Sequence, residues 1–189
     1  YLLRALAMDQ ALGDPAGVAW SQLNLGLLYN RRGEVARGLA LHQAALQSSI
    51  ALGARTTQGL AWSRLGQDYY ALGEWEEAYE AYVQAIALQT ALGQRIWAIE
   101  AQSGLAATQL ALNLRAEALA QVEGILAYLA PEALDSAREP MLIYWNCYQV
   151  LAALSDPRAV DLLRSANQQL NAQAATFTDA AWPHSFLHK

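Results

Sequence analysis

The feature that most constrains the fold is an internal repeat. The tripeptide Ala-Leu-Gly recurs at residues 11–13, 51–53 and 91–93 with a constant period of about 40 residues, and it occurs once more, at 71–73, in the middle of a period. A period of about 20 to 50 residues is typical of chains in which one supersecondary unit stacks on copies of itself, because a single unit cannot bury its apolar face alone. The period therefore predicts an elongated array, a kind of protein that binds other molecules along its length and rarely carries out chemistry.

The residues that punctuate each period predict helices. Asp14 and Pro15 form a helix start, in which Asp14 caps the helix and Pro15 occupies the first turn. Apolar-periodic segments end at residues that favour a left-handed conformation, namely Gly33, Gly53, Gly73, Gly93 and Asn113. The predicted helices span residues 1–12, 15–32, 34–52, 55–72, 74–92, 95–112, 114–129, 140–154 and 157–175.

The segment that begins at Trp62 carries a family resemblance. Residues 62–69 read Trp-Ser-Arg-Leu-Gly-Gln-Asp-Tyr and fit the pattern Trp-x₂-Leu-Gly-x₂-Tyr, with Ala78, Tyr82 and Ala85 at the expected offsets. This pattern resembles the tetratricopeptide repeat, and the neighbouring periods keep parts of it. The resemblance implies an all-α fold, a right-handed superhelical α-solenoid of stacked antiparallel helix pairs.

The repeat register assigns packing roles to several residues. Gly66 and Ala78 are expected to be small so that paired helices can approach closely, while Tyr82 fills the space between repeats. In the first copy His42 takes the aromatic position, and we interpret it as an interhelical packing residue with a partly solvent-exposed edge rather than a general base. In the degenerate fourth copy Cys147 takes the small position, which indicates an apolar filler and not a nucleophile.

Residues 1–189 are predicted to form a single domain. The register divides this domain into a half repeat over 1–13, repeats over 14–53, 54–93 and 94–130, a degenerate repeat over 139–175 and a terminal segment over 176–189. Because the first helix begins in mid-repeat, the side chains of Leu2, Leu3 and Leu6 lack the helix that normally covers them, which predicts self-association through this end.

Long repeats of this kind resemble those of kinesin light chains and of large bacterial regulators, where they follow a maltose-regulator-type nucleotide-binding module or a cyclase or kinase domain. Together with the initial half repeat and the missing initiator Met, this implies a piece of a larger signalling protein.

Composition and charge exclude several classes of partner. The chain has 12 basic and 17 acidic residues and a net charge of −5, and its arginines are scattered. Nucleic acid is therefore not an expected partner, because phosphate binding needs a concentrated basic face. No apolar run reaches the roughly 18 residues that a membrane span needs, so no membrane partner and a cytoplasmic location are expected. The single cysteine excludes an internal disulfide.

No catalytic, metal or cofactor site is predicted. Lys189 is the only lysine, so the chain cannot build a P-loop or a Schiff-base site. His184 and His188 have i, i+4 spacing, but no zinc motif with a glutamate accompanies them. The acidic run over residues 74–80 begins a helix, where carboxylates favour the positive end of the dipole.

The resemblance places the binding surface on the concave face, lined by the first helix of each repeat. By register, the candidate groove residues are Trp20, Leu23, Asn24, Leu27, Asn30, Arg64, Gln67, Tyr70, Glu100, Tyr144, Trp145 and Tyr148. Chaperone-binding relatives hold a terminal carboxylate with several cationic and amide side chains. Only Arg64 and Asn24 remain from such a clamp, which argues against that mode of binding.

Two functions are consistent with this groove. The first is a non-enzymatic protein- or peptide-binding module, which an exposed apolar patch along the groove would favour. The second is a small-ligand sensor that controls a neighbouring nucleotide-binding domain, which a closed pocket with converging Tyr144, Trp145 and Tyr148 would favour. In the first case Arg64 and Tyr70 are expected to anchor the partner without contributing to the core, whereas Trp75 in the outer turn is dispensable for binding.

Overall fold

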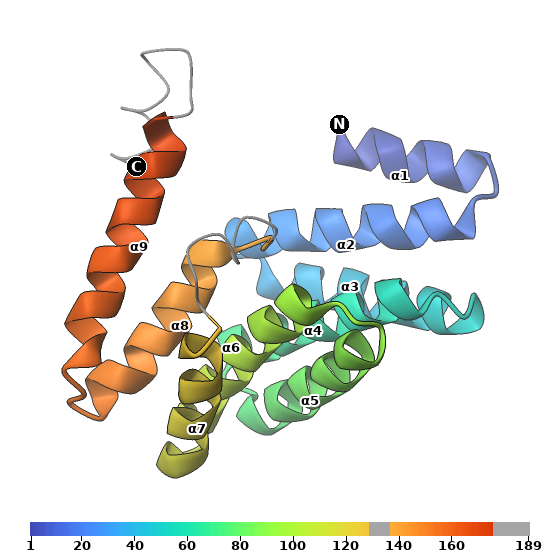
Figure 1. Ribbon diagram of the computed structural model, residues 1–189. Coiled ribbons are helices and arrows are strands. Elements are labelled where there is room, and N and C mark those ends of the chain that lie inside the picture. Colours follow the sequence, from blue (N-terminus) through green and yellow to red (C-terminus); the bar gives the residue numbers. More distant parts are fainter. Residues whose placement is uncertain (129–136, 176–189) are drawn as a thin grey trace.

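The computed structural model describes residues 1–128 and 137–175, and the regular elements of these residues are all α-helices. They are α1 (Leu2–Ala11), α2 (Pro15–Arg31), α3 (Val35–Ala51), α4 (Arg55–Leu72), α5 (Trp75–Ala91), α6 (Arg95–Ala111), α7 (Arg115–Leu126), α8 (Pro140–Ala153) and α9 (Arg158–Ala175) (Figure 1). Each predicted helix forms, and its ends lie close to the predicted ones.

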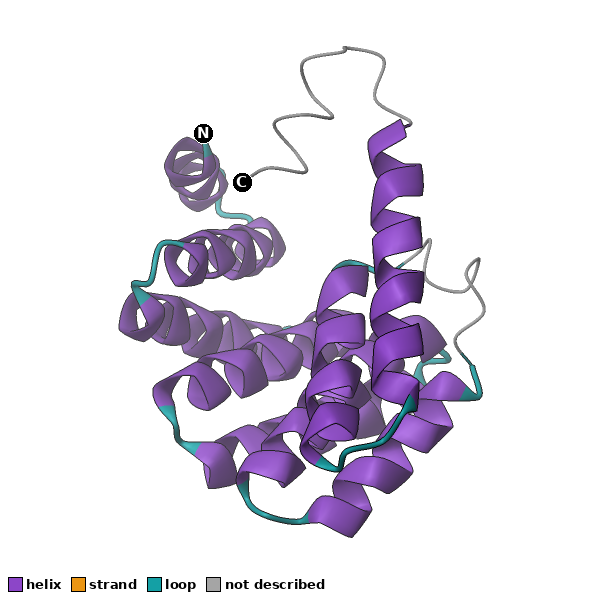
Figure 2. Cartoon of the chain, turned by 90° about the vertical axis from the view of Figure 1, so that its left-hand side faces the viewer, coloured by secondary structure: helices purple, strands orange, loops and turns teal. Residues whose placement is uncertain are grey.

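The helices stack in the order of the sequence, and each one packs against the next. They follow an arc, so that α1 and α9 lie at opposite ends of the stack in both views (Figures 1 and 2). Besides these sequential contacts, α2 contacts α4, α4 contacts α6, and α6 contacts α8. The architecture is the predicted α-solenoid, and α2, α4, α6 and α8 form a connected inner row.

The turns have the predicted chemistry. The Asp14 carboxylate accepts hydrogen bonds from the backbone N–H groups of Ala16 and Gly17 at 3.0 Å, and so caps α2. The four glycines and the asparagine predicted to end helices all have positive φ, and Asn113 reaches 61°. These short turns bring each helix back antiparallel to the one before it.

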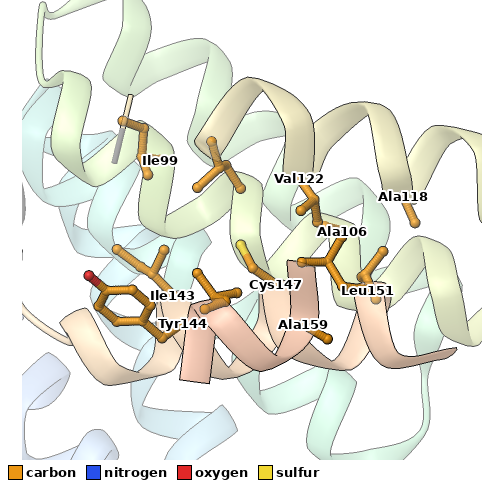
Figure 3. Close-up of a cluster of buried hydrophobic side chains, with 12 residues drawn as sticks. Ile99, Ala106, Ala118, Val122, Ile143, Tyr144, Cys147, Leu151 and Ala159 are labelled. Atoms are coloured by element: carbon orange, nitrogen blue, oxygen red, sulfur yellow. The ribbon is translucent and has the colours of Figure 1, made fainter. Parts of the chain in front are cut away.

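Buried apolar side chains form a series of clusters between the stacked helices. The largest joins α6, α7, α8 and α9, and Cys147 points into it (Figure 3). Its side chain is fully buried, and this burial raises the pKa of the thiol to about 12. Cys147 therefore acts as the small apolar filler that the register predicts.

His42 departs from its predicted environment. Its side chain is 0% exposed rather than partly in contact with solvent. The Nδ1 atom lies 2.6 Å from a carboxylate oxygen of Asp68 in α4, and Nε2 lies 3.2 Å from the backbone carbonyl oxygen of Leu23 in α2. The prediction of a partly exposed edge was wrong because a buried polar network replaces solvent around the ring.

Glycines on α4 and α6 let the Tyr82 ring of α5 pass between the helices. A Cβ atom added at Gly66 would lie 2.8 Å from the ring, and one added at Gly104 would lie closer still. The tyrosine side chain is 4% exposed, so it has little room to move away. The small residue at position 66 is thus required for close approach, as the register predicts.

We expect Gly66→Ala to lower the free energy of unfolding by about 1–3 kcal/mol, because the new methyl group overlaps the buried Tyr82 ring. The matched control is Gly124→Ala in the last turn of α7, where an added Cβ meets no atom within 4 Å. That change is expected to stabilise the chain by about 0.5–1 kcal/mol through helix propensity. Urea denaturation monitored by circular dichroism measures both effects, and equal shifts for the two variants would contradict the packing argument.

The two ends of the stack differ from its middle. In α1, Leu3 and Met8 are each 62% exposed, whereas Leu2 and Leu6 are partly buried. At the other end, α7 and α8 are joined by the long connection 127–139, whereas α3 and α4 are joined by the short turn 52–54. As a result α8 packs mainly on α6 and less on α7, and the residues directly before α8 reach the inner row.

Candidate functional site

The inner row surrounds an open cavity of about 240 Å³. Its walls come from α2, α4, α6 and α8, with additional residues from α3, α5 and the segment before α8. The predicted groove residues that line it are Leu27, Asn30, Gln67, Tyr70 and Trp145. Four helices that are far apart in sequence therefore contribute side chains to one concave site.

A carboxylate from the segment before α8 lies at the edge of this cavity. Glu139 accepts hydrogen bonds from Arg64 at 2.5 Å and from Gln67 at 3.1 Å, both on α4. Arg31, at the end of α2, pairs with its other oxygen at 3.2 Å. The Arg64 side chain is 8% exposed and that of Glu139 is 20% exposed, so their ion pair is largely shielded from water.

The two glutamates of the site have pKa values shifted in opposite directions. Burial alone would raise the pKa of Glu139, but the charge of Arg64 and the hydrogen bonds from Arg64, Gln67 and Arg31 outweigh it and hold this pKa below its ordinary value. For Glu100 on α6, burial is the larger effect and raises the pKa, although backbone N–H groups and Arg64 oppose the shift. The site thus favours the charged form of Glu139 and disfavours that of Glu100.

Glu100 holds the main chain of the same segment. One of its carboxylate oxygens accepts hydrogen bonds from the backbone N–H groups of Arg138 and Glu139, the latter at 2.9 Å. Both N–H groups precede the first turn of α8, so no helical carbonyl is available to them. Glu100 thereby fixes the position of the Arg138-Glu139 dipeptide on the inner face.

The guanidinium group of Arg138 lies over the rings of two tryptophans. The Arg138 guanidinium carbon lies 4.4 Å from the ring centroid of Trp97 on α6 and 5.4 Å from that of Trp20 on α2. Both distances allow a cation–π interaction. Burial and the nearby Arg64 charge lower the pKa of Arg138. The inner face thus contacts a positive side chain, two adjacent N–H groups and a negative side chain of the same chain.

The structure brings most of the predicted groove residues to the inner face. Trp20 is 45% exposed and Trp145 is 53% exposed, and the latter ring lies 5.6 Å from that of Tyr148 between centroids. Asn24 is partly buried and donates its side-chain amide to the carbonyl oxygen of Trp20 at 3.0 Å. These aromatic side chains lie on α2 and α8, at the two ends of the inner row.

Three of the predicted residues are buried in the fold. Leu23 is 2% exposed and belongs to the core between α2, α3 and α4, while Tyr144 is 6% exposed and belongs to the cluster around Cys147 (Figure 3). They are buried because their side chains join the apolar clusters between stacked helices, with α3 and α4 in the case of Leu23 and with α6 and α7 in the case of Tyr144. Arg64 is also 6% exposed, so the expectation that it lies outside the structured interior was wrong: it holds Glu139.

Four residues of the site were not predicted. Arg31 directly follows the predicted Asn30 on α2, and Trp97 lies three residues before the predicted Glu100, about one turn earlier on α6. Arg138 and Glu139 precede α8, in a connection without helical periodicity. Their charge was the one available signal, since a basic and an acidic residue lie next to each other directly before the proline that begins a helix.

Other kinds of site receive no support in the described part of the chain. Over residues 1–128 and 137–175, no group of three or more His, Cys, Asp or Glu side chains is placed to hold a metal ion. The helices in these ranges also include none with the length and hydropathy of a membrane span. His184, His188 and Lys189 lie outside the described residues.

Comparison with known proteins agrees with the fold. The family model described as tetratricopeptide repeat matches residues 59–91. The matched stretch contains all of α5 and most of α4, the pair that carries Gly66 and Tyr82. The match supports the tetratricopeptide family and, with it, a protein-interaction module of a generally non-catalytic kind. A comparison with curated proteins found no match.

Proposed function

We propose that the chain is a non-enzymatic module that binds a protein or peptide segment in the groove of its inner row. The observation that carries this proposal is that the inner row contacts a non-helical dipeptide, Arg138-Glu139, through both of its side chains and its two backbone N–H groups. A surface that holds its own main chain in this way has the donors, acceptors and aromatic rings that peptide recognition needs. The groove of α2, α4, α6 and α8 is thus the proposed partner site.

The shape of the groove favours a peptide over a small effector. Its cavity of about 240 Å³ is open and lies below the range of roughly 300–1,000 Å³ that is usual for small-ligand pockets. Of the three aromatic residues expected to converge on an effector, Trp145 lines the cavity, whereas Tyr144 is buried in the core. The exposed rings of Trp20 and Trp145 instead offer separate anchors along the groove.

The larger role that we propose is docking or sensing for a bacterial signalling or transcriptional regulator. The length of the period supports it, because repeats of this length resemble those of such regulators. The exposed side chains of Leu3 and Met8 on α1 support self-association as a further property of the array.

Selection from an unbiased peptide-display library on the immobilised chain tests the peptide proposal. Selected peptides are expected to lose about 2 kcal/mol of binding free energy, or roughly 30-fold in affinity, on Tyr70→Ala or Trp145→Ala. Trp75→Ala is the matched control, because this ring is 41% exposed but lies at the start of α5, outside the cavity. Loss of binding on Trp75→Ala with the groove variants unaffected would move the site to the outer face and reject the proposal.

A further inference from the structure

We infer that the groove recognises a partner segment in which a basic residue directly precedes an acidic one, and that Arg138-Glu139 occupies this site as an internal copy of that ligand. The inference rests on the proposed function, which it refines by naming the chemistry of the partner. It also implies that, in the absence of a partner, the Arg138-Glu139 dipeptide of the chain fills the site. A partner segment therefore has to displace this dipeptide before it can bind.

The first argument is that separate side chains of the inner row contact each part of the dipeptide. We call this set of side chains the seat: Trp20, Arg31, Arg64, Gln67, Trp97 and Glu100. The acidic side chain meets Arg64, Gln67 and Arg31; the two N–H groups meet Glu100; and the basic side chain meets two tryptophan rings. These contacts come from α2, α4 and α6, three helices that are well separated in sequence from the dipeptide. A ligand with the order basic then acidic reproduces these contacts, because the residue that follows the cation then carries the carboxylate that meets Arg64 while both N–H groups stay on Glu100.

The second argument concerns the charges that remain when the dipeptide leaves. The seat then keeps Arg31, Arg64 and Glu100, a net charge of +1 (2 − 1). The Arg64 side chain is 8% exposed, and a shielded cation without a carboxylate is unfavourable. A replacement ligand must therefore supply an acidic group. The two tryptophans, in turn, favour a cation next to it.

The third argument is that the dipeptide is not part of the apolar core. Arg138 and Glu139 are partly exposed and belong to none of the buried clusters, whereas α8 is anchored by Ile143, Cys147 and Val150. The apolar contacts that anchor α8 therefore do not involve the two side chains of the dipeptide, although the backbone carbonyl of Glu139 accepts hydrogen bonds from the N–H groups of Leu142 and Ile143 in the first turn. Because the dipeptide is covalently attached beside these partners, it competes with a free segment and weakens its binding.

The test is a titration of the whole chain with a peptide of residues 137–142, Ala-Arg-Glu-Pro-Met-Leu, acetylated and amidated at its ends. NMR chemical-shift changes give its affinity for the wild type and for the variant Arg138→Ala/Glu139→Ala. We expect the variant to bind about tenfold or more tightly, because its seat is vacated. The control peptide Ala-Glu-Arg-Pro-Met-Leu, with the same composition and the opposite order, is expected to bind at least tenfold more weakly than the first. Equal affinities of the two proteins, or of the two peptides, would overturn the inference.

A second variant guards against loss of stability in the double variant. Arg138→Ala alone keeps the Arg64–Glu139 pair and vacates the tryptophan rings, so the indole N–H signals of Trp20 and Trp97 should shift in the free protein and shift back when the peptide binds. Indole signals that do not respond to the peptide would overturn the inference.

The display selection separates failure of this inference from failure of the proposed function. If the selected peptides depend on the groove residues but lack a basic-acidic pair, only the inferred ligand chemistry is rejected. If no selected peptide depends on the groove residues, the proposed peptide-binding function itself is rejected.

Discussion

Replacement of Asp68 with alanine is expected to lower the free energy of unfolding by about 3–5 kcal/mol, the largest effect of any single substitution considered for this chain. Asp68 is 0% exposed, and its two oxygens meet His42 of α3 at 2.6 Å and the side-chain amide of Asn30 of α2. Removal of the carboxylate leaves a buried imidazole and a partly buried amide without their acceptor, and apolar packing does not compensate for that loss. Urea denaturation at neutral pH measures the change.

Asp161→Ala is the matched control for this substitution. Asp161 pairs with Arg164 on α9, but its side chain is 74% exposed, so its loss should change the free energy of unfolding by no more than about 0.5 kcal/mol. The double variant His42→Ala/Asp68→Ala adds a second check, because the two residues should show a strong coupling energy. Similar effects of Asp68→Ala and Asp161→Ala would show that the buried network contributes little to stability.

The period and its punctuation were sufficient to predict the fold. Repeats of this kind bury local contacts between neighbouring helices, so a pattern read over a single period contains most of the packing information. Gly66 illustrates this, because its small size follows from the same pattern that places Tyr82 against it. His42 shows the limit: the register places the residue at a packing position, but not the Asp68 carboxylate 26 residues away that replaces solvent around it.

The site was predicted only in part, for two physical reasons. Register identifies the face of a helix, but the contact of α6 with α8 buries Tyr144 on a face predicted to be open. The other reason is the connection between α7 and α8, where no periodic pattern indicates that its last two residues reach α2 and α4. Contacts between Glu139 and Arg64 span 75 residues, and neither local propensity nor the repeat determines them.

The second large effect is expected for Glu139→Ala, which should lower the free energy of unfolding by about 2–3 kcal/mol at neutral pH. The substitution leaves the Arg64 guanidinium, with a side chain that is 8% exposed, without its carboxylate. The cost is below that of a fully buried pair, because the Glu139 side chain is 20% exposed and Gln67 still accepts a hydrogen bond from Arg64 at 2.8 Å. Urea denaturation again measures the change, with the exposed Glu76→Ala on α5 as a control expected to stay within about 0.5 kcal/mol.

The pH dependence of this loss distinguishes the ion pair from simple packing. The folded chain holds the pKa of Glu139 below its ordinary value of 4.5, so the stability that its ionised form contributes is present above that value and is lost as the pH falls through the folded pKa. Glu100, whose pKa is raised mainly by burial, contributes in the opposite direction, but the Glu139 charge is the smallest of the causes of that shift, so most of this contribution is common to both proteins. The difference in unfolding free energy between the wild type and Glu139→Ala should therefore shrink as the pH is lowered from neutral to below 4.5. A difference that stays constant over this range would mean that Glu139 stabilises the chain through contacts of its methylene groups and not through its charge.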